Sequence, residues 1–220
     1  MDIYLDKICG KGTWAAYCIS LERCIERRSN FTKWAESIGL TFEFFDAIDK
    51  LNLNASDIDA HGTIVGKEIS PGATACRMSH EALYKKVLTD KIQWVFILED
   101  DAGFIHSSKE ELYEFCKTLV SSTIKPGMLQ FGYHTASKIP YSCLRPSAHP
   151  SLYKYEYADQ AHAILYKRQT IELLDLLCKD PRNIRHPIDA VINIWQRKNT
   201  CIGPEISIIE QVDPISYIWT

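Results

Sequence analysis

The chain has 220 residues, of which 25 are basic and 28 acidic, and its formal net charge is −3. A chain of this length can bury a substantial core, and we treat residues 1–220 as a single α/β domain. The near balance of charge produces no long-range field that would attract a polyanion, so a nucleic acid is not expected as a partner.

The eight cysteines do not form the close pairs of a typical zinc site, and several fall within apolar patterns. Such cysteines behave as small hydrophobic residues, which is typical of reduced thiols in the cytosol. No apolar stretch has the length of a membrane span, and residues 1–6 lack the basic and then apolar pattern of a signal peptide. These features predict a cytoplasmic protein.

The first part of the chain has the pattern of a βαβ unit. Residues 14–21 form the first expected strand, a charged turn follows at 22–28, and residues 41–45 form the second strand. Between them, Ser29 or Asn30 can cap a helix that Gly39 can end. Its apolar stripe consists of Phe31, Trp34, Ala35 and Ile38. Parallel strands would place the turn after residue 20 at the carboxyl edge of a sheet.

Residues 46–75 show no strong periodicity and are expected to form an irregular excursion. A helix is predicted from Cys76, and its apolar stripe also includes Ser79 and His80. These two polar side chains should therefore face inward. His80 is then either a core histidine that hydrogen bonds to the backbone, or a residue that orders the neighbouring acidic loop.

Residues 92–98 contain six apolar residues out of seven, which indicates a central strand covered on both faces. Glu99, Asp100 and Asp101 follow it directly. Three adjacent carboxylates repel one another, so a divalent cation or a ring of hydrogen-bond donors is expected beside them. Alternatively, these residues cap the next helix or lie in a solvated loop.

The second half is predicted to alternate strands and helices. Ser107 or Ser108 can cap a helix through Glu110 or Glu111, and strands are expected at 127–132 and 161–166. Helices should follow around 171–177 and after Pro187, and residues 201–209 should add an edge strand. The long loop at 133–159 carries tyrosines that could stack on sugar rings or simply pack the loop down. They are Tyr133, Tyr141, Tyr153, Tyr155 and Tyr157.

Four motifs, in this order, resemble glycosyltransferase family 25, which includes lipooligosaccharide and collagen galactosyltransferases. They are residues 17–28 (YCISLERCIERR), 44–49 (FFDAID), 72–80 (GATACRMSH) and 96–101 (FILEDD). The similarity runs from about residue 15 to about residue 195. It implies a GT-A-like nucleotide-sugar-binding fold with a mostly parallel central sheet flanked by helices. It also implies Mn²⁺, a UDP-hexose donor with galactose favoured and glucose next, a glycan or glycolipid acceptor, and inversion at the anomeric carbon.

The same resemblance suggests a role for particular residues. Asp101 would ligate Mn²⁺ directly and Glu99 would be a further metal ligand, while Glu99 or Asp100 could instead hold the donor ribose or a metal-bound water. Asp189 would be the catalytic base or would position the acceptor, although a carboxylate in the first turn of a helix also suits the helix dipole. The expected nucleotide-sugar contacts are Ser20, Leu21, Arg27, Arg28, Ala47, Ile48, Asp49, Ser79, His80 and Asp100.

Two departures from the family pattern affect the donor site. Ser20 stands where the family usually has Asn, and Ala73 stands where the family has Glu in a Gly-Glu-x-Gly-Cys motif. The change at Ala73 leaves the contacts of that loop, including donor choice, open. Two other functions remain, a catalytically silent nucleotide-sugar or glycan-binding relative and a metal-dependent phosphohydrolase that uses the same acidic triplet. The histidines that could serve the phosphohydrolase, His80, His106 and His134, lack ligand-like spacing.

The acceptor would be recognised by the variable loops at 50–72 and 133–159. No basic, amphipathic tail follows Ile209, so peripheral contact with a membrane has only weak support from the sequence.

Overall fold

The computed structural model describes residues 1–133, 144–147, 149, 151–158 and 160–212. Its main sheet has eight strands in the order β2-β1-β5-β10-β7-β11-β9-β8. Six of them run in one direction, and only β10 and β9 run in the other, which confirms the mostly parallel sheet. The strands are β1 (Trp14–Ser20), β2 (Glu43–Asp46), β5 (Trp94–Glu99), β7 (Met128–Gln130), β8 (Leu144–Pro146), β9 (Tyr153–Tyr155), β10 (Ala163–Lys167) and β11 (Cys201–Gly203).

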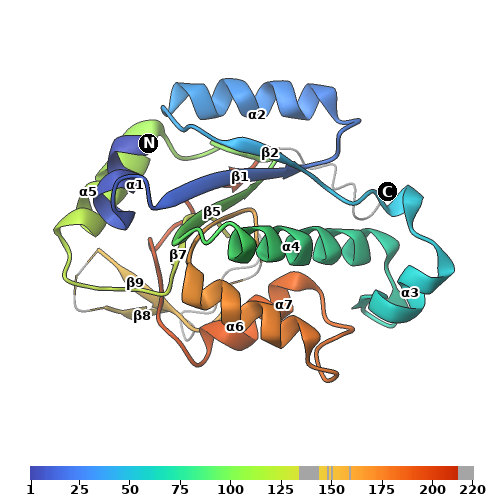
Figure 1. Ribbon diagram of the computed structural model, residues 1–220. Helices are drawn as coiled ribbons and strands as arrows, with labels where there is room; N and C mark the ends of the chain where they lie inside the picture. The colour runs from blue at the N-terminus through green and yellow to red at the C-terminus, as the bar shows by residue number, and fades with distance from the viewer. Residues whose placement is uncertain (134–143, 148, 150, 159, 213–220) are drawn as a thin grey trace.

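Helices cover both faces of this sheet (Figure 1). One face carries α1 (Asp2–Cys9), α2 (Ile25–Ser37) and α5 (Lys109–Ser121). The other carries α4 (Pro71–Thr89), α6 (Arg168–Lys179) and α7 (Ile188–Gln196). Side chains of β5 alternate between the two cores, because successive residues of a strand point to opposite faces. Phe96 and Leu98 join the first core, whereas Val95 and Ile97 join the second.

The βαβ unit is present, but two of its boundaries differ from the prediction. α2 begins at Ile25 after Cys24, so neither Ser29 nor Asn30 caps it. The charged residues that suggested a turn are good helix formers with a solvated face, and they extend the helix toward its N-terminus. Gly39 follows the helix with φ of 59°, as expected for a helix-ending glycine. β2 lies at 43–46, slightly later than predicted.

Residues 46–75 are more ordered than predicted. They form η1 (Lys50–Asn52), α3 (Ala55–His61) and a short hairpin of β3 (Ile64–Val65) and β4 (Glu68–Ile69), and α4 already begins at Pro71. Local capping stabilises these short elements. Asn54 and Asp57 form a capping box at α3, and the Ser70 hydroxyl accepts a hydrogen bond from the amide of Ala73. Such elements have no apolar stripe, so periodicity does not reveal them.

The ends of the chain hold two further differences. The helix α1 had not been expected, and β11 lies between β7 and β9 instead of forming an edge. β12 (Glu210–Gln211) pairs with β6 (Ala102–Gly103), directly after the acidic triplet. The predicted cap of α5 by Ser108 and the start of α7 after Pro187 are both confirmed.

The segment predicted as a loop at 133–159 instead contains β8 and β9, which belong to the main sheet. Tyr133 and Tyr155 are buried in it, with ring centroids 5.8 Å apart, so these two tyrosines pack the segment down. His134, Tyr141 and Asp159 lie outside the described residues. The cysteines that the structure describes are all free thiols. Among the helices of the described residues, none has the length and apolar character needed to cross a membrane.

Candidate active site

The carboxyl ends of three neighbouring parallel strands form one edge of the sheet. β2, β1 and β5 lie side by side and end at Asp46, Ser20 and Glu99. Ser20 is the ladder partner of Asp46, and Ile19 is the ladder partner of Glu99. Open α/β sheets bind their ligands beyond this edge. The turn after β1 and the acidic triplet after β5 therefore meet, as the sequence predicted.

Arg27, from the first turn of α2, holds two of the three carboxylates. Its Nη2 atom lies 2.9 Å from Oδ1 of Asp100 and 2.9 Å from Oδ2 of Asp101. The three side chains are only 14, 8 and 9% exposed, so water and salt screen these ion pairs weakly. Arg27 thus offsets part of the negative charge of the triplet.

Two neutral side chains also donate hydrogen bonds to the aspartates, and an arginine fixes one of these donors. The Ser20 hydroxyl donates to Oδ2 of Asp100 at 2.6 Å, and Gln211 donates to Oδ2 of Asp101 at 3.3 Å. Arg28 donates to both the hydroxyl and the carbonyl of Ser20, at 3.2 and 2.9 Å. Both of these hydrogen bonds from Arg28 go to Ser20, so Arg28 positions the serine that donates to Asp100.

The two aspartates remain short of positive charge despite these contacts. Burial, and then the charge of Glu99, raises the pKa of Asp101 to about 7, and burial also raises the pKa of Asp100. Oδ1 of Asp101 is buried and has no hydrogen-bond partner among the residues that the structure describes. A buried carboxylate oxygen with unused lone pairs, next to a second carboxylate, fits a hard divalent cation such as Mn²⁺.

The pH dependence of the stability of the metal-free protein should reveal the free-energy cost of ionising Asp101. Because its pKa is raised in the folded state, folding takes up a proton between about pH 4 and pH 7, and the stability that Asp101 contributes is lost as the pH rises through this window. The loss is at most roughly 4 kcal/mol. EDTA-treated Asp101→Asn protein should therefore gain stability over the wild type between about pH 5 and pH 8 in thermal melts. A difference in melting temperature between the two proteins that does not change with pH would contradict the raised pKa of Asp101.

The segment after β2 is fixed from two sides. The amide of Ala47 donates to the Ser20 carbonyl at 2.9 Å, and the amide of Ile48 donates to the Ser79 hydroxyl at 2.9 Å. Asp49 pairs with Arg23 and accepts from the amide at the start of η1. The hydrogen bond from Arg23 lowers the pKa of Asp49. The predicted uracil and ribose segment is thus held against both β1 and α4.

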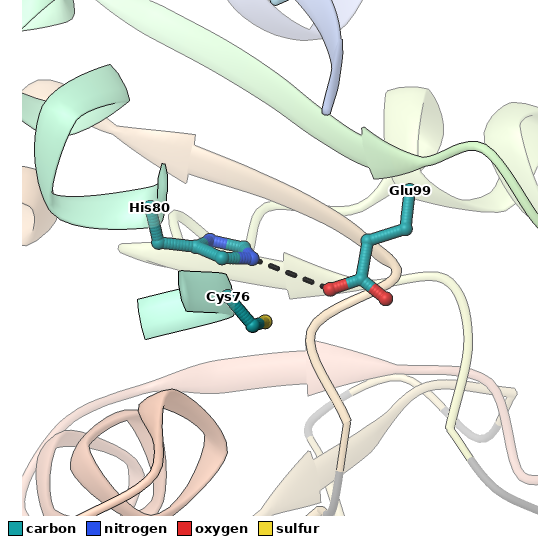
Figure 2. A group of neighbouring side chains, drawn as sticks. All are labelled: Cys76, His80 and Glu99. Atoms are coloured by element: carbon teal, nitrogen blue, oxygen red, sulfur yellow. Dashed lines mark hydrogen bonds and ion pairs between the residues drawn. The ribbon is translucent and has the colours of Figure 1, made fainter. Parts of the chain in front are cut away.

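The carboxylate of Glu99 faces α4, where Figure 2 shows it beside His80. Oε1 lies 3.3 Å from Nε2 of His80, whose side chain is fully buried. Burial alone would raise the pKa of Glu99, but the hydrogen bond and charge of His80, with His162 and Arg27, lower it overall. His80 thus contacts the acidic triplet. This contact favours a role in ordering the acidic loop over that of a core histidine bonded to the backbone.

A cavity lies above this edge of the sheet, and most of the predicted site residues line it. Arg28 and His80 are not part of the lining, because they lie behind Ser20 and Glu99. Of the lining residues that sequence reasoning missed, Arg23 and Cys76 stood inside recognised motifs, whereas Gln211 carried no signal. The lining consists of Ile19, Ser20, Leu21, Arg23, Arg27, Ala47, Ile48, Asp49, Lys50, Gly72, Ala75, Cys76, Ser79, Glu99, Asp100, Asp101 and Gln211.

Asp189 lines a different cavity, together with Tyr157, His186, Asn193 and Arg197. Its Oδ1 atom accepts a hydrogen bond from the amide of Ala190 at 2.8 Å, in the first turn of α7. The structure thus does not bring Asp189 together with the other predicted residues in one cavity.

A residue of the second cavity nevertheless affects the pKa of a residue that lines the first. Burial, and then the charges of Glu99, Asp189 and Asp101, raises the pKa of the Cys76 thiol well above its usual value. Cys76 itself lines the first cavity. The carboxylate of Asp189, on α7, therefore affects the pKa of a thiol that lines the first cavity.

A buried arginine fixes the segment that leads into α7. Arg77 from α4 is 1% exposed and donates to the carbonyls of Cys178, Asn183 and His186. It also forms an ion pair with Glu81 at 2.7 Å. Because one side chain on α4 binds three carbonyls before Pro187, α4 positions the start of α7 and thereby Asp189.

Comparison with known proteins identifies the family. The model of glycosyltransferase family 25, described as an LPS biosynthesis protein family, matches residues 14–142. The chain belongs to glycosyltransferase family 25. This match includes both motifs that end at the site, the turn after β1 and the acidic triplet after β5.

Curated relatives resemble part of this family 25 chain. The lipooligosaccharide biosynthesis protein lic2B of Haemophilus influenzae is 31% identical over 86 residues, which are 39% of this chain and 32% of that protein. The lacto-N-neotetraose biosynthesis glycosyltransferase LgtB of Neisseria meningitidis is 32% identical over 92 residues, 39% of this chain and 31% of that protein. A glycosyltransferase 25 family member of Drosophila pseudoobscura is 33% identical over 97 residues, 40% of this chain and 16% of that protein. The matched part thus spans a third or less of these relatives.

The fold of this family 25 chain also resembles a solved structure. A glycosyltransferase involved in the glycosylation of the major capsid of PBCV-1 superimposes with a TM-score of 0.51. The match covers 92% of this chain and 94% of that chain at 8% sequence identity. At this identity the likeness concerns the fold alone. It agrees with the mostly parallel central sheet flanked by helices that the sequence predicts.

Proposed function

We propose that this family 25 chain transfers a hexose from a UDP-sugar to a glycan hydroxyl, with inversion at the anomeric carbon. Galactose is the favoured sugar and glucose the next. The observation that carries the proposal is the cavity at the carboxyl edge of the sheet, where Asp100 and Asp101 share Arg27 and one carboxylate oxygen lacks a partner. The names of the relatives, a lipooligosaccharide biosynthesis protein and a lacto-N-neotetraose biosynthesis glycosyltransferase, support a role in the synthesis of a lipooligosaccharide or another surface glycan.

Asp101 is the proposed direct ligand of Mn²⁺, with Asp100 and Glu99 as the further carboxylates for the metal, its water or the donor ribose. When bound there, Mn²⁺ would supply Lewis-acid stabilisation to the UDP leaving group. Three cationic side chains line the same cavity, and a guanidinium can bind phosphate oxygens bidentately. We propose that they bind the diphosphate, and that Arg27 exchanges carboxylate for phosphate when the donor enters. The three are Arg23, Arg27 and Lys50.

The nucleoside and the acceptor are assigned to different elements. Ser79 holds the amide of Ile48, so α4 positions the segment of Ala47, Ile48 and Asp49 that is proposed to contact uracil and ribose. Asp189 is the proposed base that takes the proton of the acceptor hydroxyl. Since Asp189 lines the second cavity, we propose that the acceptor enters from the α7 side and the donor from the β2 side.

A screen of UDP-sugars with Mn²⁺ tests the proposed activity, with UDP release followed in the presence and absence of candidate glycans. A transferase should release UDP faster when a suitable acceptor is present. Binding of UDP-sugar without release would indicate the catalytically silent relative that the altered residue Ala73 left open. Release of inorganic phosphate without an acceptor would instead indicate a phosphohydrolase.

We expect Mn²⁺ to strengthen UDP binding, because the ion would join Asp101 to the diphosphate, and we expect EDTA to reverse the effect. Calorimetric titrations of UDP with and without Mn²⁺ measure it. In Asp101→Asn protein the two titrations should give nearly the same affinity, whereas Asp46→Asn, at an exposed carboxylate of the same sheet edge, should respond to Mn²⁺ like the wild type. Equal UDP affinity in both titrations of the wild type would count against the metal assignment.

A further inference from the structure

Cys76, His80 and Glu99 form a second group of possible metal ligands. Their Sγ, imidazole nitrogen and carboxylate oxygen atoms all lie within 4.8 Å of one another. Cys76 and His80 are four residues apart on α4, so both side chains lie on one face of that helix. Glu99 approaches them from the end of β5, and Figure 2 shows the three side chains directed into the same space.

The chemistry of these ligands differs from that of the aspartate pair. Sulfur, imidazole nitrogen and carboxylate oxygen together favour Zn²⁺, whereas all-oxygen sites suit Mn²⁺ and Mg²⁺. Zinc bonds of about 2.0–2.3 Å place tetrahedral ligand atoms roughly 3.3–3.8 Å apart. Oε1 of Glu99 and Nε2 of His80, at 3.3 Å, already have this separation, and Sγ of Cys76 lies within 4.8 Å of both atoms.

The surroundings also suit a bound cation. Cys76 and Glu99 line the first cavity while His80 is fully buried behind them, so three protein ligands would leave one coordination position open toward the cavity. Nδ1 of His80 has no hydrogen-bond partner among the described residues. Metal binding at Nε2 would replace its hydrogen bond to Glu99 and would require the neutral imidazole with its proton on Nδ1.

We propose that Cys76, His80 and Glu99 bind Zn²⁺ in a site separate from the oxygen-ligand site of Asp100 and Asp101. The site goes beyond the proposed transfer reaction, since it uses two residues of α4 that the Mn²⁺ site does not need. Oε1 of Glu99 would serve the zinc site, because it is the oxygen directed at His80, and Oε2 is left for the role proposed above beside Asp100 and Asp101. Metal binding can be measured without a donor or an acceptor, so the outcome does not depend on whether the chain is a transferase.

Cobalt titration of the reduced, metal-free protein tests the site directly, because Co²⁺ replaces Zn²⁺ in such sites and reports its ligands by its absorption. We expect a thiolate-to-cobalt charge-transfer band together with the visible bands of a tetrahedral site, saturating near one equivalent. Stoichiometric Zn²⁺ should abolish the band, and an excess of Mn²⁺ should leave it in place. Absence of the charge-transfer band in folded wild-type protein would overturn the proposal.

Variants assign the band to these residues. Cys76→Ser should remove the charge-transfer band, and His80→Gln should weaken Zn²⁺ binding by about tenfold or more. Cys9→Ser is the matched control, since Cys9 is a partly exposed thiol on the opposite face of the sheet, and Asp101→Asn controls for the aspartate pair. Both controls should retain the band. If Cys76→Ser does not fold, Cys76→Ala serves in its place, and a band that persists without the Cys76 thiol overturns the assignment.

Discussion

Asp101→Ala should abolish donor turnover, leaving no more than a few per cent of the wild-type rate at saturating Mn²⁺. The variant removes the carboxylate whose Oδ1 atom is buried without a partner, and with it the proposed direct ligand of the metal. A metal that acts as a Lewis acid on the leaving group supplies several kcal/mol of transition-state stabilisation, so the loss should be roughly a hundredfold or more. Initial rates of UDP release over a range of Mn²⁺ concentrations measure this effect.

Loss of activity must be separated from loss of structure. Asp101 is packed against Arg27 and Gln211, so Asp101→Asn provides a variant of equal size that keeps the packing. We expect it to be as inactive as Asp101→Ala but at least as stable as the metal-free wild type near neutral pH. Asp46→Asn should keep most of its activity, because Asp46 is exposed and neither it nor its partner Arg28 lines the cavity. More than a few per cent activity in Asp101→Asn would remove Asp101 from the metal site.

Asp189→Asn should lower kcat by about 10²–10⁴-fold, the usual contribution of a general base. An amide cannot accept the proton of the acceptor hydroxyl. UDP affinity should stay near that of the wild type, because Asp189 lines the second cavity and the proposed nucleotide contacts line the first. Steady-state kinetics with both substrates varied, together with UDP titrations, separate the effect on chemistry from the effect on binding.

The structure also indicates what a purely structural role of Asp189 would look like. Its Oδ1 atom accepts from the amide of Ala190, and an asparagine can make the same hydrogen bond at the start of α7. If that is its whole function, Asp189→Asn should change neither kcat nor the melting temperature by much. Glu172→Gln, at an exposed carboxylate of α6, is the control for removal of a charge. A kcat within a fewfold of the wild type would return Asp189 to the role of a helix-terminal residue.

Periodicity predicted the elements that bury a continuous apolar stripe or run. The strand before the acidic triplet, the helix with Phe31 and Ala35, and the helix after Pro187 are all present. Elements stabilised by side-chain capping were missed, among them α3 with its Asn54 box and the first turn of α4 after Ser70. The sequence indicates an edge strand at β11 because no local pattern shows that β9, inside the segment predicted as a loop, pairs with it.

The sequence alone determined the family motifs, the mostly parallel sheet and the meeting of the β1 turn with the acidic triplet. These follow from local patterns and from the rule that parallel strands end at one edge. Only the tertiary structure shows that the three carboxylates have different partners. Asp100 and Asp101 pair with Arg27, whereas Glu99 contacts His80. It likewise placed Asp189 in a second cavity and brought Gln211 to Asp101. The direction of a side chain after a strand depends on the residues packed against it from distant parts of the chain, and local periodicity carries no information about those contacts.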